Sequence, residues 1–110
     1  MPSINKINIW NSASRQNIKE VLGYAVKKRN GYYHDLKMID ERRGDTIDSF
    51  ESAGFVHIGQ TLKDRTFGIT KLGDEYYKDV FGSYNYYSKL LAGKWERFKS
   101  KLFSNIKGKD

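Results

Sequence analysis

The sequence predicts a mostly helical α+β fold, with a two-stranded β-hairpin between helices and an additional long amphipathic helix at the C-terminal end. In most of the 110-residue chain the apolar residues recur every three or four positions, which is the spacing of one helix face. Between residues 55 and 69 they alternate instead, as in strands that bury one face. The length suits one modest core, so we expect a single folding unit.

The first predicted helix begins near Asn17 and carries its apolar residues on one stripe. These residues are Ile18, Val21, Leu22, Ala25 and Val26. Ser14 or Asn17 is suited to cap its start, the latter with Glu20 in the register of a capping box. Asn30-Gly31 is a typical left-handed stop. Residues 1–14 before this helix form a predicted arm or short strand, with Ile7 and Ile9 at alternate positions.

Two shorter helices follow, over residues 35–44 and 45–53. Their predicted inward residues are Leu36 and Ile39 in the second helix, and Ile47 and Phe50 in the third. Asp45 has the side chain of an N-cap, and Gly54 is placed to end the third helix. Both helices should therefore pack against the first one.

The period then changes to that of a hairpin. "FVHIG" and "TFGIT" are the predicted strands, and the polar "GQTLKDR" is the tip between them. Thr70 is the expected N-cap of a fourth helix with Leu72, Tyr76 and Val80 at spacing four. A long amphipathic helix closes the chain. Its predicted stripe is Tyr84, Tyr87, Leu91, Trp95, Phe98, Leu102 and Ile106.

The net charge of +7 is unevenly distributed. Residues 1–30 hold six basic and one acidic side chain (+5), residues 31–82 seven and ten (−3), and residues 83–110 seven and two (+5). Basic segments attract polyanions such as nucleic acid, because neutralised phosphates release their counterions. The acidic middle of the chain does not share this property.

Several classes of function are disfavoured by the residues present. Cysteine is absent, which excludes disulfides, thiol nucleophiles and Cys-ligated zinc. His34 and His57 fall on different predicted elements, without the spacing of a catalytic triad, a metal site or a phosphate-binding loop. We therefore expect no enzyme, no metal and no cofactor. No secretory signal or apolar run of about 20 residues is present, so we expect a cytoplasmic protein rather than a membrane one.

The segment "SAGFVHIGQTLKDRTFGITKLGDEYY" resembles the winged helix-turn-helix superfamily. The likeness rests on the Gly-Phe turn, the hairpin, and a Leu-Thr-x-x-Gly type of helix entry, here "ITKLG", and it extends over residues 15–82. With its aromatic and basic closing helix at 83–110, the chain is similar to small prophage-borne proteins of the YjcQ type. The resemblance implies double-stranded DNA as partner, with the third helix in the major groove and the hairpin, or wing, beside a phosphate backbone.

Three basic clusters are the candidate DNA-binding residues that fit this arrangement. They are Lys63 and Arg65 at the wing, Arg42 and Arg43 before the third helix, and Lys27, Lys28 and Arg29 at the end of the first. Ordinary solvated turns, or cations that complement a helix dipole, explain them equally well. The predicted outward residues of the third helix, Asp45, Asp48, Ser49, Glu51 and Ser52, depart from the family pattern, because carboxylates repel phosphates.

Three functions remain open from the sequence. The first is a DNA-binding transcriptional regulator of phage type, a homodimer through Tyr84, Tyr87, Leu91, Trp95, Phe98 and Leu102. The second is a protein-interaction module, such as a phage-type inhibitor or adaptor, whose acidic third helix meets a basic protein partner. The third is an interfacial helix on anionic lipid, because the last helix also carries Lys89, Lys94, Arg97, Lys99 and Lys101. Gly93 within this helix would permit close approach of another helix.

Overall fold

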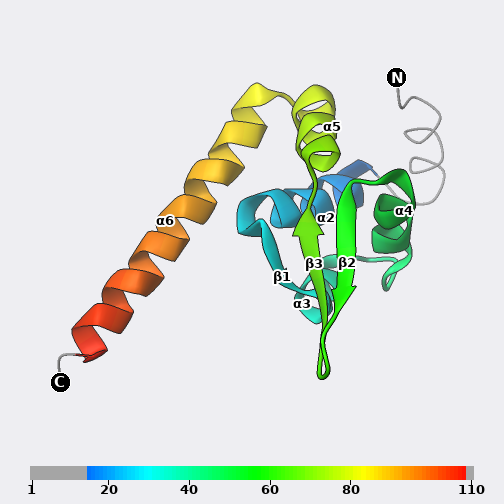
Figure 1. Cartoon of the computed structure of the whole chain (residues 1–110). Helices are drawn as coiled ribbons and strands as arrows, with labels where there is room; N and C mark the ends of the chain where they lie inside the picture. Colours follow the sequence, from blue (N-terminus) through cyan, green and yellow to red (C-terminus); the bar gives the residue numbers. More distant parts are fainter. Residues whose placement is uncertain (1–14, 109–110) are drawn as a thin grey trace.

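The computed structural model describes residues 15–108, with side chains as far as Ser104 (Figure 1). The predicted arm at 1–14, with Ile7, Ile9 and Ser14, lies outside the described residues. The elements in chain order are α2 (Arg15–Lys28), β1 (Asn30–Tyr32), α3 (Tyr33–Ile39), α4 (Asp45–Ala53), β2 (Val56–Gln60), β3 (Arg65–Ile69), α5 (Lys71–Phe81) and α6 (Ser83–Gly108). The mostly helical α+β class is as predicted.

The sheet has one strand more than the predicted hairpin. Its order is β1-β3-β2 with antiparallel pairing, and β2 and β3 are the predicted hairpin strands. Asn30-Gly31 is not the helix stop that the sequence suggested: Arg29, at φ 71°, takes the left-handed conformation, and Asn30 and Gly31 pair with β3. Gly31 lies opposite Phe67, where an added Cβ would be 3.0 Å from the ring. The lack of a side chain thus lets β1 approach the Phe67 ring.

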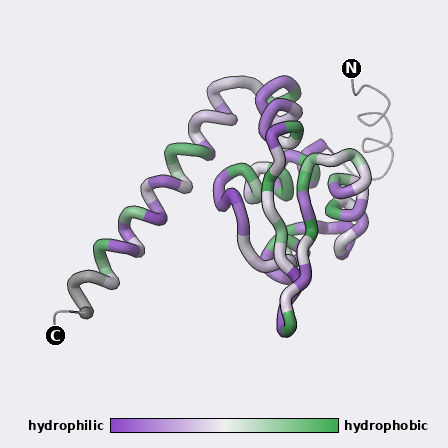
Figure 2. Tube along the Cα trace, in the orientation of Figure 1, coloured by the Kyte–Doolittle hydropathy of each residue, from purple (hydrophilic) through white to green (hydrophobic). Residues whose placement is uncertain are grey.

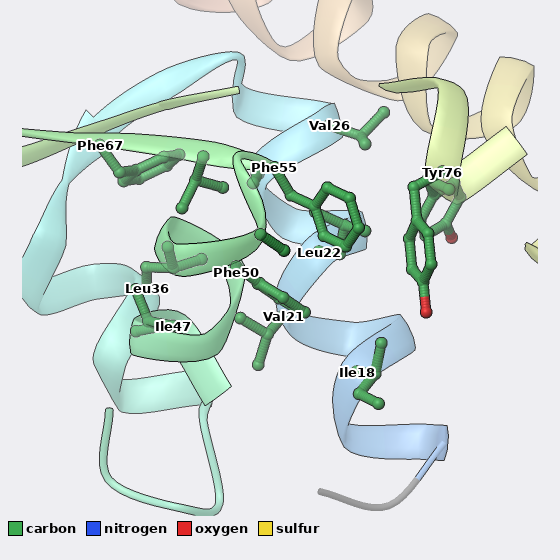
Figure 3. Close-up of a cluster of buried hydrophobic side chains, with 14 of the residues drawn as sticks. Ile18, Val21, Leu22, Val26, Leu36, Ile47, Phe50, Phe55, Phe67 and Tyr76 are labelled. Carbon is green, nitrogen blue, oxygen red and sulfur yellow. The ribbon is translucent and has the colours of Figure 1, made fainter. Parts of the chain in front are cut away.

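The predicted stripe of α2 forms the centre of the core. All five of its apolar residues are 0% exposed, and Leu36, Ile47, Phe50 and Val56 join them from other elements. Figure 3 shows this cluster, with labelled side chains from α2, α4 and α5 among its members. Phe55 stacks on Tyr76 with ring centroids 4.2 Å apart, which joins the end of α4 to α5. Burial of these aromatic and branched side chains supplies most of the stabilisation expected of a domain of this size.

The connection between α3 and α4 differs from the prediction. α3 begins at Tyr33 and ends at Ile39, and residues 40–44 form a turn rather than the end of the helix. Asp40 is buried in this turn, where its carboxylate accepts backbone N–H groups at the start of α4 from Gly44 at 3.1 Å and Thr46 at 3.0 Å. Asp45 is accordingly the first residue of α4, and the N-cap position belongs to Gly44.

Asn17 is likewise not a cap. It lies inside α2, is buried, and its side-chain amide donates to Asp40 Oδ1 and to Thr46 Oγ1, both at 2.9 Å. Its own oxygen accepts from the backbone N–H of Glu41 at 3.0 Å. The three buried side chains Asn17, Asp40 and Thr46 thus tie α2 to the turn and to α4. The pKa of Asp40 is lowered: burial opposes ionisation, but the hydrogen bonds from Asn17 and the backbone outweigh it.

α5 begins as predicted, and its predicted inward set is partly confirmed: Tyr76 is buried and Val80 packs partly buried against the core. The hydroxyl of Thr70 accepts from the N–H of Gly73 at 3.0 Å, which confirms the N-cap. Leu72, expected inside, is 38% exposed, and the buried residues are Gly73, Tyr76, Tyr77 and Phe81. A Cβ at Gly73 would overlap the carbonyl oxygen of Phe55, so the glycine of the "ITKLG" entry lets α5 start against the end of α4.

α6 runs along one side of the domain and continues past it (Figure 1). It packs against α2 and α5, with Tyr86 and Leu90 against the core. A Cβ at Gly93 would overlap the carbonyl oxygen of Lys27. The helix that approaches Gly93 closely is therefore α2 of the same chain.

Candidate nucleic-acid interface

The wing extends from the body of the domain beyond α3 (Figure 1). Its tip is closed by hydrogen bonds between Thr61 and Asp64, with N–H to carbonyl at 2.7 Å and hydroxyl to carbonyl at 2.9 Å. Leu62 is fully exposed there and Lys63 is exposed beside it. A structured tip with an apolar and a cationic side chain in solvent can reach a surface that the rest of the domain does not touch.

Arg65 connects the wing to α3. Its guanidinium carbon lies 4.0 Å from the centroid of the Tyr33 ring, a cation–π contact that orients an otherwise mobile side chain. Tyr33 also reaches toward the α3–α4 turn: a Cβ added to Gly44 would lie 3.0 Å from the Tyr33 hydroxyl. The same Cβ would lie 4.0 Å from Cε of Lys37. Tyr33 thus extends from the Arg65 guanidinium to the Gly44 turn.

A shallow hollow of about 370 Å³ lies on the outer side of α3, lined by His34, Lys37, Met38, Asp40 and Arg43. Met38 is 74% exposed at this hollow. We call Lys37, Arg43, Lys63 and Arg65 the wing–α3 cations. Asp64, between two of them in sequence, partly offsets their charge.

Three of the seven candidate cations are engaged in ion pairs between helices. Arg29 holds Asp74 of α5 by two hydrogen bonds of 2.8 Å, and these bonds raise the pKa of Arg29. Lys27 and Lys28 contact Glu96 of α6 at 2.6 and 3.3 Å, and the hydrogen bond from Lys27 is the main reason that the pKa of Glu96 is lowered. The end of α2 is therefore a junction that joins α5 and α6 to the domain.

Arg42 and Arg43 stand in the turn before α4. The Arg42 guanidinium is 3.8 Å from the Asp45 carboxylate in an exposed pair, a geometry that contributes little. Arg43 has a positive φ of 55° and an exposed side chain. Of the candidate set, then, Arg43, Lys63 and Arg65 face solvent, and among residues 15–104 their side chains form no salt bridge with a carboxylate.

α4 presents the acidic surface that the sequence predicts. Asp45, Asp48, Glu51 and Ser52 are exposed, and Ser49 is half-buried with its hydroxyl donating to the Asp45 carbonyl at 3.1 Å. The helix "DTIDSFESA" contains no Lys, Arg, Asn or Gln, the residues that read base edges and phosphates.

The apolar stripe of α6 is exposed in the single chain. The exposed fractions are 84% for Tyr84, 48% for Tyr87, 66% for Leu91, 58% for Trp95, 55% for Phe98 and 49% for Leu102. Phe103, outside the predicted stripe, is 64% exposed beside them. Figure 2 shows apolar and polar bands alternating along this helix.

Sequence reasoning missed Tyr33, Lys37 and Met38 as surface residues of the candidate interface. The available signal for Lys37 and Met38 was the outer side of α3, where they and His34 are exposed away from the inward Leu36. Tyr33 was missed because the helix was expected to begin near Asp35, and it begins at Tyr33.

No protein-family model, curated protein or solved structure matches the chain. Within residues 15–108, no helix is long and apolar enough to cross a bilayer, and no group of three or more His, Asp or Glu side chains is arranged to hold a metal ion.

Proposed function

We propose that the chain is a small DNA-binding protein of winged helix-turn-helix architecture that contacts duplex DNA through the wing–α3 cations. The observation that carries the proposal is the protruding hairpin whose Arg65 is oriented by Tyr33 of α3, together with Lys37 and Arg43, which line one hollow on α3. The order of elements from α2 to α5 supports the architecture. A role in transcriptional regulation, of the kind that phage and mobile elements encode, follows from the sequence resemblance alone.

The acidic surface of α4 gives this binding mode its particular form. Asp45, Asp48 and Glu51 would meet the phosphates if α4 entered the major groove, and no cation on α4 compensates them. Like charges at contact distance cost on the order of 1 kcal/mol each even in water, and more where water is excluded. We therefore assign the DNA contact to the wing and α3, with α4 held away from the duplex.

The candidate residues divide accordingly. Arg43, Lys63 and Arg65 are retained, and Lys37 is added because it lies at the same hollow as Arg43. Lys27, Lys28 and Arg29 have a structural function in joining α2 to α5 and α6. Arg42 is not included among the DNA-contacting residues, because its guanidinium is near the Asp45 carboxylate.

The test is a titration of random duplex DNA at several salt concentrations. Each phosphate neutralised contributes about −0.9 to the slope of log affinity against log salt, so Lys63→Ala combined with Arg65→Ala should reduce that slope by about 1 to 2. The matched control is Lys94→Ala with Lys101→Ala, which removes the same charge from exposed positions on α6. A slope that falls only in the control would place the DNA contact on α6 and refute binding through the wing. An affinity weaker than about 10⁻⁴ M in low salt would refute DNA binding itself.

A second candidate function is favoured by α4 itself. Three exposed carboxylates on nine residues form a surface suited to a basic protein partner, as in an inhibitor or adaptor built on this scaffold. Asp48→Asn with Glu51→Gln distinguishes the two roles. The double variant should strengthen DNA binding if the carboxylates stand near the duplex, and it should weaken a complex with a protein partner if they form that interface.

A further inference from the structure

We infer that the exposed stripe of α6 is covered by the α6 of a second copy of this chain, antiparallel to the first and centred on Trp95. This inference does not rest on DNA binding. It begins with the extent of the apolar surface. Six large apolar side chains of the stripe, from Tyr84 to Leu102, are between 48% and 84% exposed. Together they present several hundred Å², which exceeds the usual scattered surface residues and approaches the roughly 800 Å² per partner of a stable interface.

The spacing of the stripe is compatible with pairing against a second copy of the same helix. Leu91 lies four residues before Trp95 and Phe98 three after; Tyr87 lies eight before and Leu102 seven after; Tyr84 and Ile106 are each eleven away. A two-fold axis at Trp95 therefore brings Leu91 against Phe98 of the partner copy, and Tyr87 against Leu102. An interface with two-fold symmetry requires such a self-complementary pattern, whereas lipid or an unrelated protein does not.

The period also suits two straight helices. The steps along the stripe are 3, 4, 4, 3, 4 and 4 residues, an eleven-residue repeat close to the turn of an undistorted α-helix. Trp95 and Phe98 already stack with ring centroids 5.8 Å apart, which presents a flat aromatic surface at the proposed centre. Small rotations of the two copies would let these rings meet.

The position of the domain leaves room for the partner. Tyr86, Leu90 and Gly93 face α2 and α5, and on a helical wheel they lie opposite the stripe. Arg97 also points back, donating to the Lys27 carbonyl at 3.0 Å. Each folded domain thus lies on the far side of its own helix, and two copies can pair along α6 without collision of their domains.

The charges of α6 predict how this pairing responds to salt. Lys94 and Lys101 flank the stripe on one side, with no acidic residue among their neighbours on that flank. In the dimer, lysines of the two copies approach one another, so raised salt should strengthen association by screening them. Binding of the same helix to anionic lipid or to DNA would weaken with salt instead.

Sedimentation of the full chain, without DNA, tests the pairing. We expect twice the monomer mass of 12.8 kDa for the wild type, and a folded monomer for Trp95→Asp. Ser100→Asp adds the same charge to an exposed position away from the stripe and should remain dimeric. If Trp95→Asp loses its helical circular dichroism, Leu91→Asp replaces it. The inference is overturned if the wild type stays monomeric at every protein and salt concentration. In that case a blue shift of its tryptophan fluorescence with anionic vesicles would show that the stripe binds lipid instead.

Disulfide trapping tests the register, and the chain has no cysteine to interfere. An equimolar mixture of Leu91→Cys and Phe98→Cys should form a mixed disulfide. Each variant alone should not, because in the antiparallel pair its two copies are about 9 to 12 Å apart along the axis, beyond disulfide reach. Efficient self-linking of either variant alone overturns the antiparallel arrangement. A dimer that binds no duplex leaves this inference intact and refutes only the proposed function.

Discussion

α2 and α6 carry the same kind of apolar stripe, but the stripe is buried in α2 and exposed in α6. Every apolar residue of the α2 stripe is 0% exposed, whereas the α6 stripe from Tyr84 to Leu102 is at least 48% exposed. The difference lies in their neighbours. α2 packs against α3, α4, α5, α6 and β3, whereas the described part of α6 packs mainly against α2 and α5, which lie on its other face. Periodicity therefore identifies residues that share a face, and the fold determines whether that face is covered.

The largest expected effect comes from the same substitution in the two helices. Leu22→Ala should lower the free energy of unfolding by about 2 to 5 kcal/mol, through lost burial and a cavity at a side chain that is 0% exposed. Leu91→Ala, at 66% exposure, should change it by less than about 0.5 kcal/mol in dilute solution. Chemical denaturation of both variants measures the contrast. Equal losses at a concentration where the chain is monomeric would show that α6 is covered within the chain.

The next expected effect concerns the polar link between α2 and α4. Asp40→Asn should cost about 1 to 3 kcal/mol, because it replaces an acceptor that serves several buried N–H groups by a group that also donates. Thr46→Val removes a partner of Asn17 without touching the carboxylate and is the matched comparison. A cost near zero for Asp40→Asn would mean that water replaces these bonds.

The same carboxylate gives stability a defined pH dependence. The pKa of Asp40 lies below its usual value of 3.8 in the folded protein, so the charged form stabilises the fold above that value. This contribution is lost as the pH falls through the folded pKa. The free energies of unfolding of the wild type and of Asp40→Asn, measured between neutral pH and about pH 2, should therefore converge at the acid end. Parallel curves would contradict the assignment.

Much of the fold could be predicted because its signals are local. The α2 stripe, the Gly54 stop with φ 82°, the Thr70 cap and the hairpin depend on neighbouring residues in the sequence. β1 could not be predicted from three residues, because its pairing with β3 joins positions more than thirty apart. Asp40 falls inside the predicted helix 35–44, and its burial in a turn depends on Asn17, which is 23 residues away.

The candidate site was predictable only as a set of residue types. Charge patterning indicated basic clusters at the end of α2 and at the wing, but each cation's partner depends on tertiary structure. Arg29 and Lys27 are paired with Asp74 and Glu96, which are 45 and more residues away, and no local pattern reveals this. The acidic surface of α4 was predictable, because in a short amphipathic helix the outward side follows directly from the inward Ile47 and Phe50.

A smaller effect should follow from separating α2 and α6. Gly93→Ala adds a Cβ that would overlap the Lys27 carbonyl, a strain of about 1 to 3 kcal/mol, while alanine returns about 1 kcal/mol of helix propensity. The net loss should be about 1 kcal/mol, with faster amide hydrogen exchange in the first half of α6. Ser88→Ala, at an exposed position of the same helix, is the control. Unchanged exchange in Gly93→Ala would mean that α6 adjusts without leaving α2.

The smallest expected effect concerns the ion pair that closes the end of α2. Arg29 and Asp74 meet through two 2.8 Å hydrogen bonds, with side chains 34% and 14% exposed, so each of Arg29→Gln and Asp74→Asn should cost at most about 1 kcal/mol. Because the two substitutions remove the same interaction, the double variant should lose little more stability than either single variant. High salt should reduce all three losses. The salt dependence of DNA affinity tests the assignment of Arg29. Arg29→Gln should leave the slope of log affinity against log salt unchanged, because the guanidinium is bound to Asp74 of α5. A slope reduced by about 1 would show that Arg29 contacts DNA.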